Sequence, residues 1–326
     1  MTKISIIVPC FNEEKAIPIF YKELINTLQT INYEYQILFI NDGSQDLTLK
    51  TLKSLSAEDS NVQYLSFSRN FGKEAAMLAG MRHSTGDLVV TMDVDLQDPP
   101  ALIPQMIAAI ENENFDSVAT RRVSRKGEPR LRSLFAKMFY QLINKLSNTD
   151  IVDGARDYRM MTRQMVNSIL ELGEYHRFSK GIFGWVGYQT KWLEYQNIER
   201  VAGETKWSFW KLFKYAVEGI VAFTTVPLRV ASFFGVLFSL IAFAMLIFII
   251  LRRLLFGDPV AGWTSQVCIF LITGGLQMIF LGIIGEYLSK TYMEVKARPQ
   301  YFIKEKNLKY AGKNVQDHDP EIEVIG

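Results

Sequence analysis

The sequence predicts an α/β fold, a doubly wound and mostly parallel sheet, followed by an amphipathic interfacial helix and a two-helix transmembrane hairpin. Two observations lead to this prediction. Up to about residue 200, short β-rich runs alternate with helical runs, and repeated units of this kind form a parallel sheet covered by helices on both faces. Beyond residue 229, two apolar runs reach the length that a bilayer crossing requires.

Four strand–helix units build the expected sheet. The expected strands are residues 4–8, 35–40, 63–67 and 88–92. The helices that follow them, in the same order, are residues 15–29, 47–55, 72–83 and 101–111. Ligands of such sheets lie beyond the carboxyl ends of the strands. Polar clusters occupy that position after the first, second and fourth strands, at residues 12–14, 41–46 and 93–95. We expect these clusters to line one crevice.

The two apolar runs are residues 230–251 and 265–288. The first is uncharged over roughly the 20 residues that a spanning helix needs, and soluble helices seldom lack a polar face over that length. The second contains Gln277 and Glu286 as its strongly polar members. A buried helix of a soluble core is the alternative for each run. A short connector, residues 252–264, would place both ends of the hairpin on one side.

Basic residues indicate the orientation of the hairpin. Those on its terminal side are Lys206, Lys211, Lys214, Arg229, Lys290, Lys296 and Arg298, whereas the connector offers Arg252 and Arg253. The positive-inside bias therefore predicts that both termini are cytoplasmic. Residues 209–221 separate polar from apolar side chains at helical spacing, as in a helix lying on lipid headgroups. Packing against the α/β domain is the alternative for this helix.

These patterns divide the chain into four parts. They are an α/β domain (1–203), an amphipathic juxtamembrane region (204–228), the hairpin (229–290) and a cytoplasmic C-terminal tail (291–326). A net charge of +2 gives no reason to expect nucleic acid as a partner. Cys10 and Cys268 lie far apart, and the histidines are scattered, so no disulfide framework or zinc site is expected. The first residues lack the features of a secretory signal, so we expect the chain to start in the cytosol.

Asp93 and Asp95 stand one residue apart directly after the fourth strand. In an extended stretch their side chains point the same way, and the amide oxygen of Gln97 falls on the same side. Hard oxygen ligands of this kind bind Mg²⁺ or Mn²⁺, which usually keep positions open for substrate phosphates. A solvated acidic turn ended by prolines is the alternative. We expect a divalent-cation site that binds a diphosphate.

Other polar residues extend this candidate site. Asp42, after the second strand, is placed to accept hydrogen bonds from a ribose or a base edge, although an ordinary turn is the alternative. Residues 69–73 would bring cations and backbone N–H groups to the same edge. Asp153 and Asp157 are both candidates to reach the crevice, and their spacing does not choose between them. Phosphate-binding cations crowd residues 119–132, namely Arg121, Arg122, Arg125, Lys126, Arg130 and Arg132.

Together these motifs resemble the family 2 glycosyltransferases of the GT-A fold. Within that family the chain is similar to polyprenyl-phosphate hexosyltransferases related to dolichol-phosphate mannose synthase and the bactoprenol glucosyltransferases. The resemblance covers nearly the whole chain up to about residue 299. Its matching pieces are the hairpin and residues 8–14, 41–44, 69–73, 93–100, 157–161 and 203–208.

The resemblance implies an inverting, metal-dependent glycosyltransferase of the inner membrane. It would transfer glucose from UDP-glucose to undecaprenyl phosphate, with Mg²⁺ or Mn²⁺ as its cofactor. Mannose transfer from GDP-mannose and an inactive nucleotide-binding scaffold are the alternatives. The implied partners are a nucleotide sugar, a polyprenyl phosphate and the lipid bilayer, without nucleic acid. A homo-oligomer would form through the membrane and juxtamembrane helices, where Gly275, Gly282 and Ser289 make a small-residue stripe.

Residue roles follow from the resemblance position by position. The binding set comprises Pro9, Glu13 and Asp42 at the nucleoside, together with Lys73 and Asp93. Arg121 and Lys206, with Arg200, would bind phosphates of the donor or the acceptor. The metal ligands are Asp93, Asp95 and Gln97. The catalytic set is Asp95, Asp157 and Arg200, in which Asp157 matches the carboxylate suggested as a base. Two positions depart from the family's pattern, because Val94 replaces a more common alanine and residues 155–159 differ from Gly-Asp-Phe-Arg.

Overall fold

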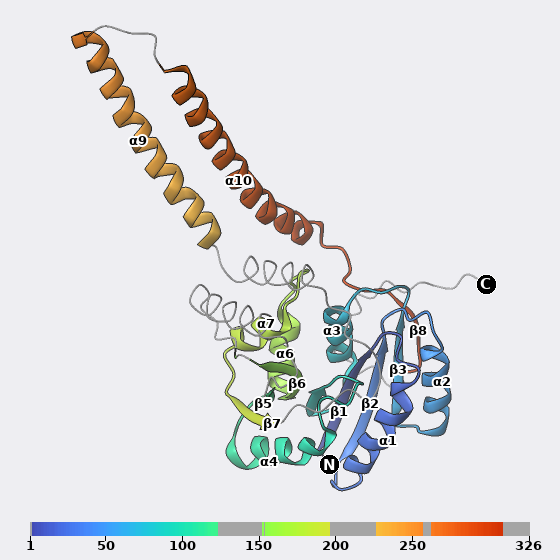
Figure 1. Cartoon of the computed structure of the whole chain (residues 1–326). Coiled ribbons are helices and arrows are strands. Elements are labelled where there is room, and N and C mark those ends of the chain that lie inside the picture. Colours follow the sequence, from blue (N-terminus) through green and yellow to red (C-terminus); the bar gives the residue numbers. More distant parts are fainter. Residues whose placement is uncertain (1, 123–151, 153, 196–225, 257–261, 309–326) are drawn as a thin grey trace. The chain divides into compact units, whose positions relative to one another are not determined.

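The structure is a computed structural model that describes residues 2–122, 152, 154–195, 226–256 and 262–308 (Figure 1). The chain forms two compact units. The first contains Met1–Leu212 and Arg298–Gly326, and the second contains Phe213–Ala297. Each unit is described separately below. The predicted juxtamembrane region lies outside the described residues up to residue 225.

The first unit is built on an eight-stranded sheet of order β7-β5-β6-β4-β1-β2-β3-β8. Its strands are β1 (Lys3–Cys10), β2 (Glu34–Asn41), β3 (Val62–Phe67), β4 (Leu88–Thr91), β5 (Ser117–Arg122), β6 (Ala155–Thr162), β7 (Thr190–Tyr195) and β8 (Ile303–Lys306). Strands β4, β1, β2 and β3 pair in parallel, as do β5 and β7. Strands β6 and β8 run antiparallel to their neighbours. The predicted mostly parallel α/β sheet is confirmed, with two antiparallel strands that the sequence pattern did not reveal.

Helices cover both faces of this sheet (Figure 1). They are α1 (Ala16–Leu28), α2 (Thr48–Glu58), α3 (Lys73–His83), the short η1 (Pro100–Leu102), α4 (Ile103–Glu113), α6 (Arg163–Glu171) and α7 (Ser179–Trp185). Alternate residues of β1 serve the two faces, as the two-residue period of a strand requires. Ile4 and Ile6 belong to the core cluster with α1 and α4, whereas Ile7 packs beneath Gly80 of α3. A Cβ at Gly80 would lie 2.1 Å from Ile7 Cγ2, so α3 approaches the sheet closely.

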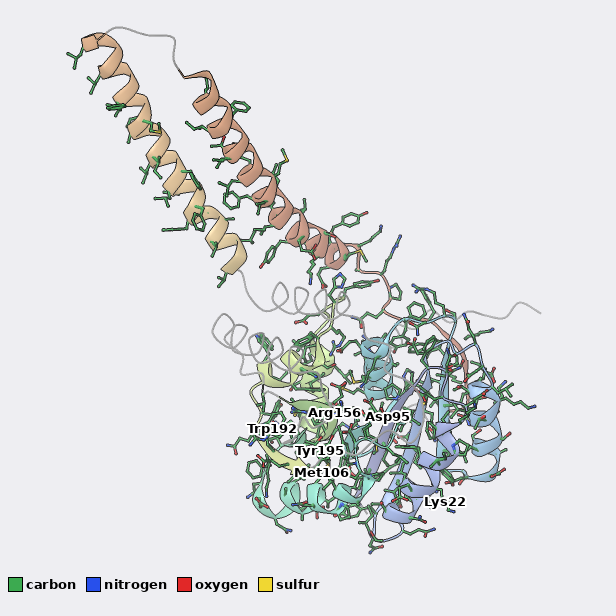
Figure 2. The ribbon with its side chains drawn as sticks, viewed as in Figure 1. Lys22, Asp95, Met106, Arg156, Trp192 and Tyr195 are labelled. Carbon is green, nitrogen blue, oxygen red and sulfur yellow. The ribbon has the colours of Figure 1, made fainter. Side chains whose placement is uncertain are left out.

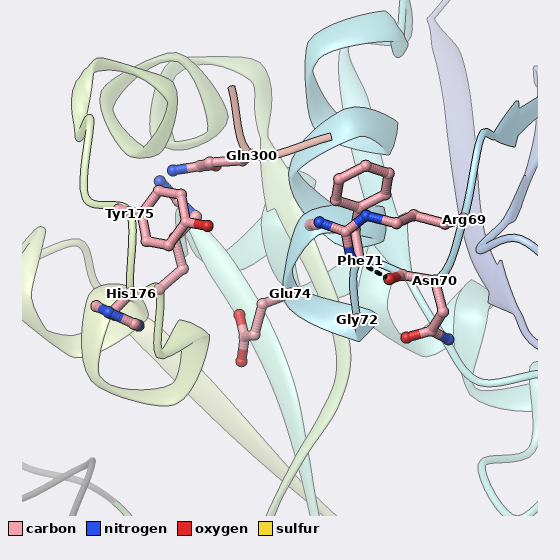
Figure 3. Close-up of a pocket in the computed structure, with 10 residues that line it drawn as sticks. Arg69, Asn70, Phe71, Gly72, Glu74, Tyr175, His176 and Gln300 are labelled. Atoms are coloured by element: carbon pink, nitrogen blue, oxygen red, sulfur yellow. Dashed lines mark hydrogen bonds between the residues drawn. The ribbon is translucent and has the colours of Figure 1, made fainter. Parts of the chain in front are cut away.

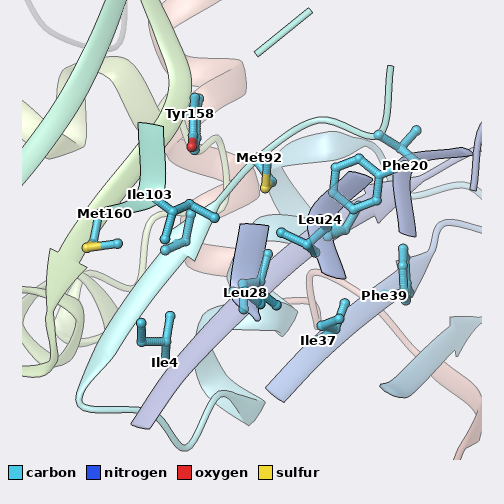
Figure 4. Packing of buried hydrophobic residues seen from close by; sticks show 14 of the residues in the cluster. Ile4, Phe20, Leu24, Leu28, Ile37, Phe39, Met92, Ile103, Tyr158 and Met160 are labelled. Atoms are coloured by element: carbon cyan, nitrogen blue, oxygen red, sulfur yellow. The ribbon is translucent and has the colours of Figure 1, made fainter. Parts of the chain in front are cut away.

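The larger core lies under α1 and α4 (Figure 4). Phe20 of α1 meets Phe39 of β2 edge-to-face, with ring centroids 6.2 Å apart. Leu24 and Leu28 continue this apolar stripe at helical spacing, and each is buried. The core holds the carboxyl ends of β1, β2 and β4 in register, which fixes where their following loops begin.

The chain after the hairpin differs from the predicted tail. Residues 300–307, which we call the C-terminal strap, add β8 to the edge of β3. Tyr301 stacks on Phe67 with centroids 5.0 Å apart and is 5% exposed. The Tyr64 hydroxyl donates to Glu305 at 2.8 Å, and Asn307 Oδ1 accepts from the Tyr64 N–H. The strap is therefore a structural part of the first unit.

The second unit contains α9 (Val226–Phe256) and α10 (Trp263–Lys296), which contact each other. By length and composition, the segment Ile272–Lys296 of α10 could cross a membrane. In α9 the recognisable apolar stretch is shorter, Val230–Met245. Large apolar side chains such as Phe243 and Phe270 are more than 60% exposed within this unit. These findings support one membrane-crossing helix, and the predicted second span stays a prediction.

Candidate functional site

The acidic segment after β4 forms a turn rather than the extended stretch that the sequence suggested. Asp95 accepts a hydrogen bond from the Gln97 backbone N–H at 3.2 Å, and Leu96 has a φ of 56°. A positive φ at a leucine reverses the chain direction, so alternation of side chains cannot extend from Asp93 to Gln97. Gln97 was expected on the side of Asp93 and Asp95 only if the extended stretch continued, and that condition is not met. Their assignment as cation ligands stays a prediction.

Lys73, the first residue of α3, joins two carboxylates at this edge of the sheet. Its Nζ lies 2.6 Å from Asp93 Oδ1 and 2.6 Å from Asp157 Oδ2. The backbone of Asp157 is also held in place, because its carbonyl oxygen accepts a hydrogen bond from Thr91 Oγ1 at 2.6 Å. Burial alone would raise the pKa of Asp157, but Lys73 holds that pKa well below its ordinary value. Burial would likewise lower the pKa of Lys73, and the two carboxylates raise it instead.

This arrangement tests whether the residues suit a divalent cation. Two carboxylates, Asp93 after the end of β4 and Asp157 in β6, already converge on one positive charge, the Lys73 ammonium group. Asp95 and Gln97 follow in the same turn and add oxygen ligands of the type that Mg²⁺ and Mn²⁺ prefer. Among the described residues, no group of three or more His, Cys, Asp or Glu side chains could hold a metal ion. The cation site at Asp93, Asp95 and Gln97 therefore rests on the chemistry of these oxygen ligands and stays a prediction.

Asp42 holds a loop in place. Its two carboxylate oxygens accept from the backbone N–H groups of Phe71 at 2.6 Å and Gly72 at 2.9 Å. The residue is 4% exposed, and burial raises its pKa although these two hydrogen bonds act in the opposite direction. At Gly43 a Cβ would lie 2.3 Å from the Arg69 carbonyl carbon, so the two loops are in direct backbone contact. The structure thus gives Asp42 a supporting role beside the predicted nucleoside contact.

The first two polar clusters do meet, as the sequence predicted. Asn12 Oδ1 accepts from the Gln45 N–H at 2.9 Å, and the Asn12 N–H donates to Ser44 Oγ at 2.9 Å. The Glu13 N–H donates to Thr48 Oγ1 at 2.8 Å. Glu13 is half-buried, as is Pro9 near the end of β1. Both predicted nucleoside contacts therefore lie beside the loop after β2.

The predicted phosphate-binding cations have different outcomes. Arg121 forms an ion pair with Glu194 on the neighbouring strand β7, so its charge is already balanced. Arg200 and Lys206 lie outside the described residues, as do Arg125, Lys126, Arg130 and Arg132. Asp153 also lies outside them, whereas Asp157 joins the Lys73 cluster. Asp157 is thus placed beside Lys73, and the candidacy of Asp153 stays a prediction.

A second charged cluster was missed by the sequence reading. Asp98 is fully buried and accepts from Arg156 Nε at 3.1 Å and from the Tyr195 hydroxyl. Figure 2 shows Arg156 and Tyr195 close together, on β6 and β7. The Tyr158 hydroxyl donates to the Pro99 carbonyl at 3.2 Å and anchors the same turn. The sequence feature that could have indicated this cluster is Asp98-Pro99-Pro100, because a carboxylate before two prolines cannot be part of a regular strand interior.

Glu74 is a further residue that the sequence reading passed over. Ser179 donates to its carboxylate from the backbone N–H, at 3.2 Å to each oxygen, and from its hydroxyl. Burial raises the pKa of Glu74 to about 7, and nearby Asp157 adds to this effect. Its position next to Lys73 in the sequence was the only hint. A carboxyl group that titrates near neutral pH therefore adjoins the Lys73 cluster.

Comparison with known proteins gives consistent results. Residues 5–170 match the model of the family described as glycosyl transferase family 2. A prophage bactoprenol glucosyl transferase homolog of Escherichia coli strain K12 is 45% identical over 302 residues, 93% of this chain and 98% of that protein. A bactoprenol glucosyl transferase of Shigella phage SfX is also 45% identical, over 93% of this chain and 99% of its own. A solved glucosyl-3-phosphoglycerate synthase of Mycobacterium tuberculosis is 18% identical, with a TM-score of 0.45 over 68% of this chain and 78% of its own.

Proposed function

The chain belongs to glycosyl transferase family 2, and from this premise we propose that it transfers glucose from UDP-glucose to a polyprenyl phosphate. The resemblance drawn from the sequence motifs is confirmed at the level of the family. The observation that carries the proposal is 45% identity to bactoprenol glucosyl transferases over 93% of the chain. That coverage includes the apolar helices, so the similarity extends beyond the sheet domain.

The side chains at the sheet edge support a single displacement. A lipid phosphate monoester carries its second pKa at about 6, so it is largely ionised near neutral pH and needs alignment more than deprotonation. One of its oxygens would bond to the anomeric carbon while the bond to the nucleoside diphosphate breaks, which inverts the configuration. Asp157, held ionised by Lys73, would orient the reacting groups. Asp93, Asp95 and Gln97 would hold Mg²⁺ or Mn²⁺, which stabilises the departing diphosphate when bound.

The apolar helices suit a lipid acceptor. We propose that α9 and α10 form a two-span hairpin in the inner membrane, with both termini cytoplasmic. The segment Ile272–Lys296 has the length and composition of a span, and exposed apolar side chains line both helices. A polyprenyl tail stays in the bilayer while a sugar nucleotide stays in water, so the reaction must occur where the two phases meet. The homo-oligomer stays a prediction.

The test is transfer of radiolabelled sugar by the purified full chain. UDP-glucose and GDP-mannose are offered separately with undecaprenyl phosphate and Mg²⁺ or Mn²⁺. We expect a lipid-extractable glucoside from UDP-glucose that chelator abolishes, and a loss of at least about a hundredfold in Asp95→Asn. Glu23→Gln, an exposed carboxylate on α1, is the matched control and keeps full activity. A product that retains the anomeric configuration would refute the single displacement, and an absence of lipid product with every donor would refute the proposed acceptor.

A further inference from the structure

A cavity of about 360 Å³ lies beside the Lys73 cluster within the first unit (Figure 3). The first turn of α3 forms one wall, with Gly72, Glu74 and Ala75. Residues 175–177, which precede α7, form a second wall. Gln300 of the C-terminal strap also lines the cavity and points towards Tyr175. Three segments that are remote in the sequence therefore build one enclosure.

Two buried polar atoms in this lining lack partners among the described residues. Arg177 is 8% exposed, and its Nη atoms donate to the carbonyls of Leu172 at 2.7 Å and Ile169 at 3.4 Å, which leaves its Nε–H unpaired. Gln300 donates from Nε2 to the Glu174 carbonyl, which leaves its buried Oε1 unpaired. Unsatisfied buried groups are costly. The two residues that carry these atoms, Arg177 and Gln300, both line the cavity.

The two arginines of the lining favour an anionic ligand. The Arg69 guanidinium lies over the Phe71 ring, 4.1 Å from its centroid, and adds a second positive charge to that of Arg177. Burial lowers the pKa of Arg177, so a bound anion would stabilise its charged form. The positive end of the α3 helix dipole faces the same space. The Glu74 carboxyl group, with its pKa raised to about 7, is engaged by Ser179 and carries a full negative charge only above that pH.

We propose that this cavity binds a phosphate monoester group. Phosphate oxygens would accept from Arg177 Nε and from Arg69, and a monoprotonated phosphate would donate its P–OH to Gln300 Oε1. This inference rests on the proposed function for the source of the phosphate, which is the polyprenyl acceptor.

The location of the cavity suits that source. Gly72 and Glu74 flank Lys73, whose ammonium group contacts Asp157. A phosphate held in the cavity would therefore lie next to the carboxylate proposed to orient the nucleophile. Asp93 and Asp95, the proposed ligands of the donor's cation, are not among the residues that line the cavity. The strap contributes Gln300, which gives the segment after α10 a role in binding the acceptor.

The test is a binding measurement on the purified full chain in detergent. Farnesyl phosphate is titrated by calorimetry, with farnesol, inorganic phosphate and UDP as separate arms. Arg69→Gln removes an exposed side chain, and Gln300→Glu places a negative charge against the ligand. We expect each substitution to raise the Kd for farnesyl phosphate about tenfold, through a lost charged hydrogen bond in Arg69→Gln and through charge repulsion in Gln300→Glu, and to leave UDP binding unchanged. Lys22→Gln, an exposed cation on α1, is the matched control and keeps the wild-type Kd.

Each outcome decides the inference. Competition by inorganic phosphate supports recognition of the phosphate group itself, and binding of farnesyl phosphate alone supports a lipid-linked phosphate. Equal binding of farnesol and farnesyl phosphate, or unchanged Kd values in both variants, overturns the proposal and leaves the cavity to water. Because the titration needs no turnover, variant-dependent binding without glucose transfer would refute the proposed function alone. Glucose transfer with an unchanged acceptor KM in both variants would refute the phosphate site alone.

Discussion

Lys73 Nζ lies 2.6 Å from Asp157 Oδ2, although 84 residues separate the two in the sequence. The lysine begins α3 and the aspartate lies in β6. This contact opposes the effect of burial and keeps the carboxylate ionised throughout the neutral range. Asp157 therefore acts as a fixed negative charge, and a residue with so low a pKa is a weak base.

Replacing Lys73 should make the activity sensitive to acid. In Lys73→Met, burial would raise the pKa of Asp157 with the main opposing charge removed, while Lys180 and Arg156 still lower it. The carboxylate would then be protonated as the pH falls, so kcat/KM should decline at pH 5.5 relative to pH 8 more steeply than in the wild type. The measurement is the pH profile of glucose transfer. Lys191→Met, which removes an exposed partner of Glu113, is the control, and parallel profiles for all three proteins would contradict the prediction.

The same substitution should strengthen cation binding in the absence of nucleotide. The Lys73 ammonium group occupies Asp93 Oδ1, so a divalent cation must compete with it for that oxygen. We expect Lys73→Met to bind Mn²⁺ roughly tenfold more tightly, equivalent to about 1.4 kcal/mol. The free Mn²⁺ signal in electron paramagnetic resonance measures this directly. An unchanged affinity would show that the lysine and the cation occupy separate positions.

The buried ion pair should matter for stability far more than an exposed one. Arg156→Met leaves the fully buried Asp98 without its positive partner, and such a loss costs about 3–5 kcal/mol. Lys191→Met breaks an exposed pair with Glu113 and should cost at most about 1 kcal/mol. Thermal unfolding of the full chain in detergent compares the two. Equal midpoints would mean that Tyr195 alone satisfies Asp98.

Glu74 should destabilise the fold at alkaline pH. Its pKa rises from 4.5 to about 7 on folding, chiefly through burial, so its contribution to stability is greatest below pH 4.5 and is lost as the pH rises through 7. Glu74→Gln stays neutral and still accepts from Ser179. Its unfolding midpoint relative to the wild type should therefore increase between pH 5 and pH 8, by about 2–4 °C for each kcal/mol. A pH-independent difference, as expected for the exposed control Glu23→Gln, would contradict this.

The C-terminal strap should stabilise the sheet domain. Tyr301→Ala removes a ring that is 5% exposed and stacked on Phe67, a loss of about 3–5 kcal/mol for a buried aromatic residue. Phe302→Ala, at the next residue, removes a ring that is 39% exposed and should cost about 1 kcal/mol. Unfolding midpoints of the two variants give the comparison. A similar cost for both would place the strap's contribution in its backbone pairing rather than in Tyr301.

Local patterns in the sequence predicted the strands well. Each of the first four predicted strands lies within two residues of its observed boundaries, because continuous apolar runs bounded by polar turns identify buried strands. The short strand β8, Ile303–Lys306, was assigned to a tail. Its alternating lysine and glutamate residues are typical of an edge strand. Edge strands are often short and charged, so they lack the continuous apolar run by which a buried strand is recognised.

The site was predicted by residue type more than by geometry. Asp93 and Asp95 were found from their spacing, but the positive φ of Leu96 is a conformational outcome that spacing does not encode. The partners of Asp42 lie 29 and 30 residues away, and those of Glu74 lie 105 residues away. Contacts over such separations depend on how helices pack on the sheet. A single sequence therefore shows which residues are chemically competent and leaves open which of them will be paired.

The pairing of β8 with β3 has a consequence for biosynthesis. Tyr64 and Asn307 are hydrogen-bonded across 243 residues, so the sheet cannot be completed until both apolar helices have left the ribosome. At translation rates of about 5–20 residues per second, the open edge of β3 waits for roughly 12–50 s. During that interval the nascent chain carries an unpaired strand edge while its apolar helices are still being synthesised. Maturation of the sheet domain is thereby made dependent on the emergence of α9 and α10 from the ribosome.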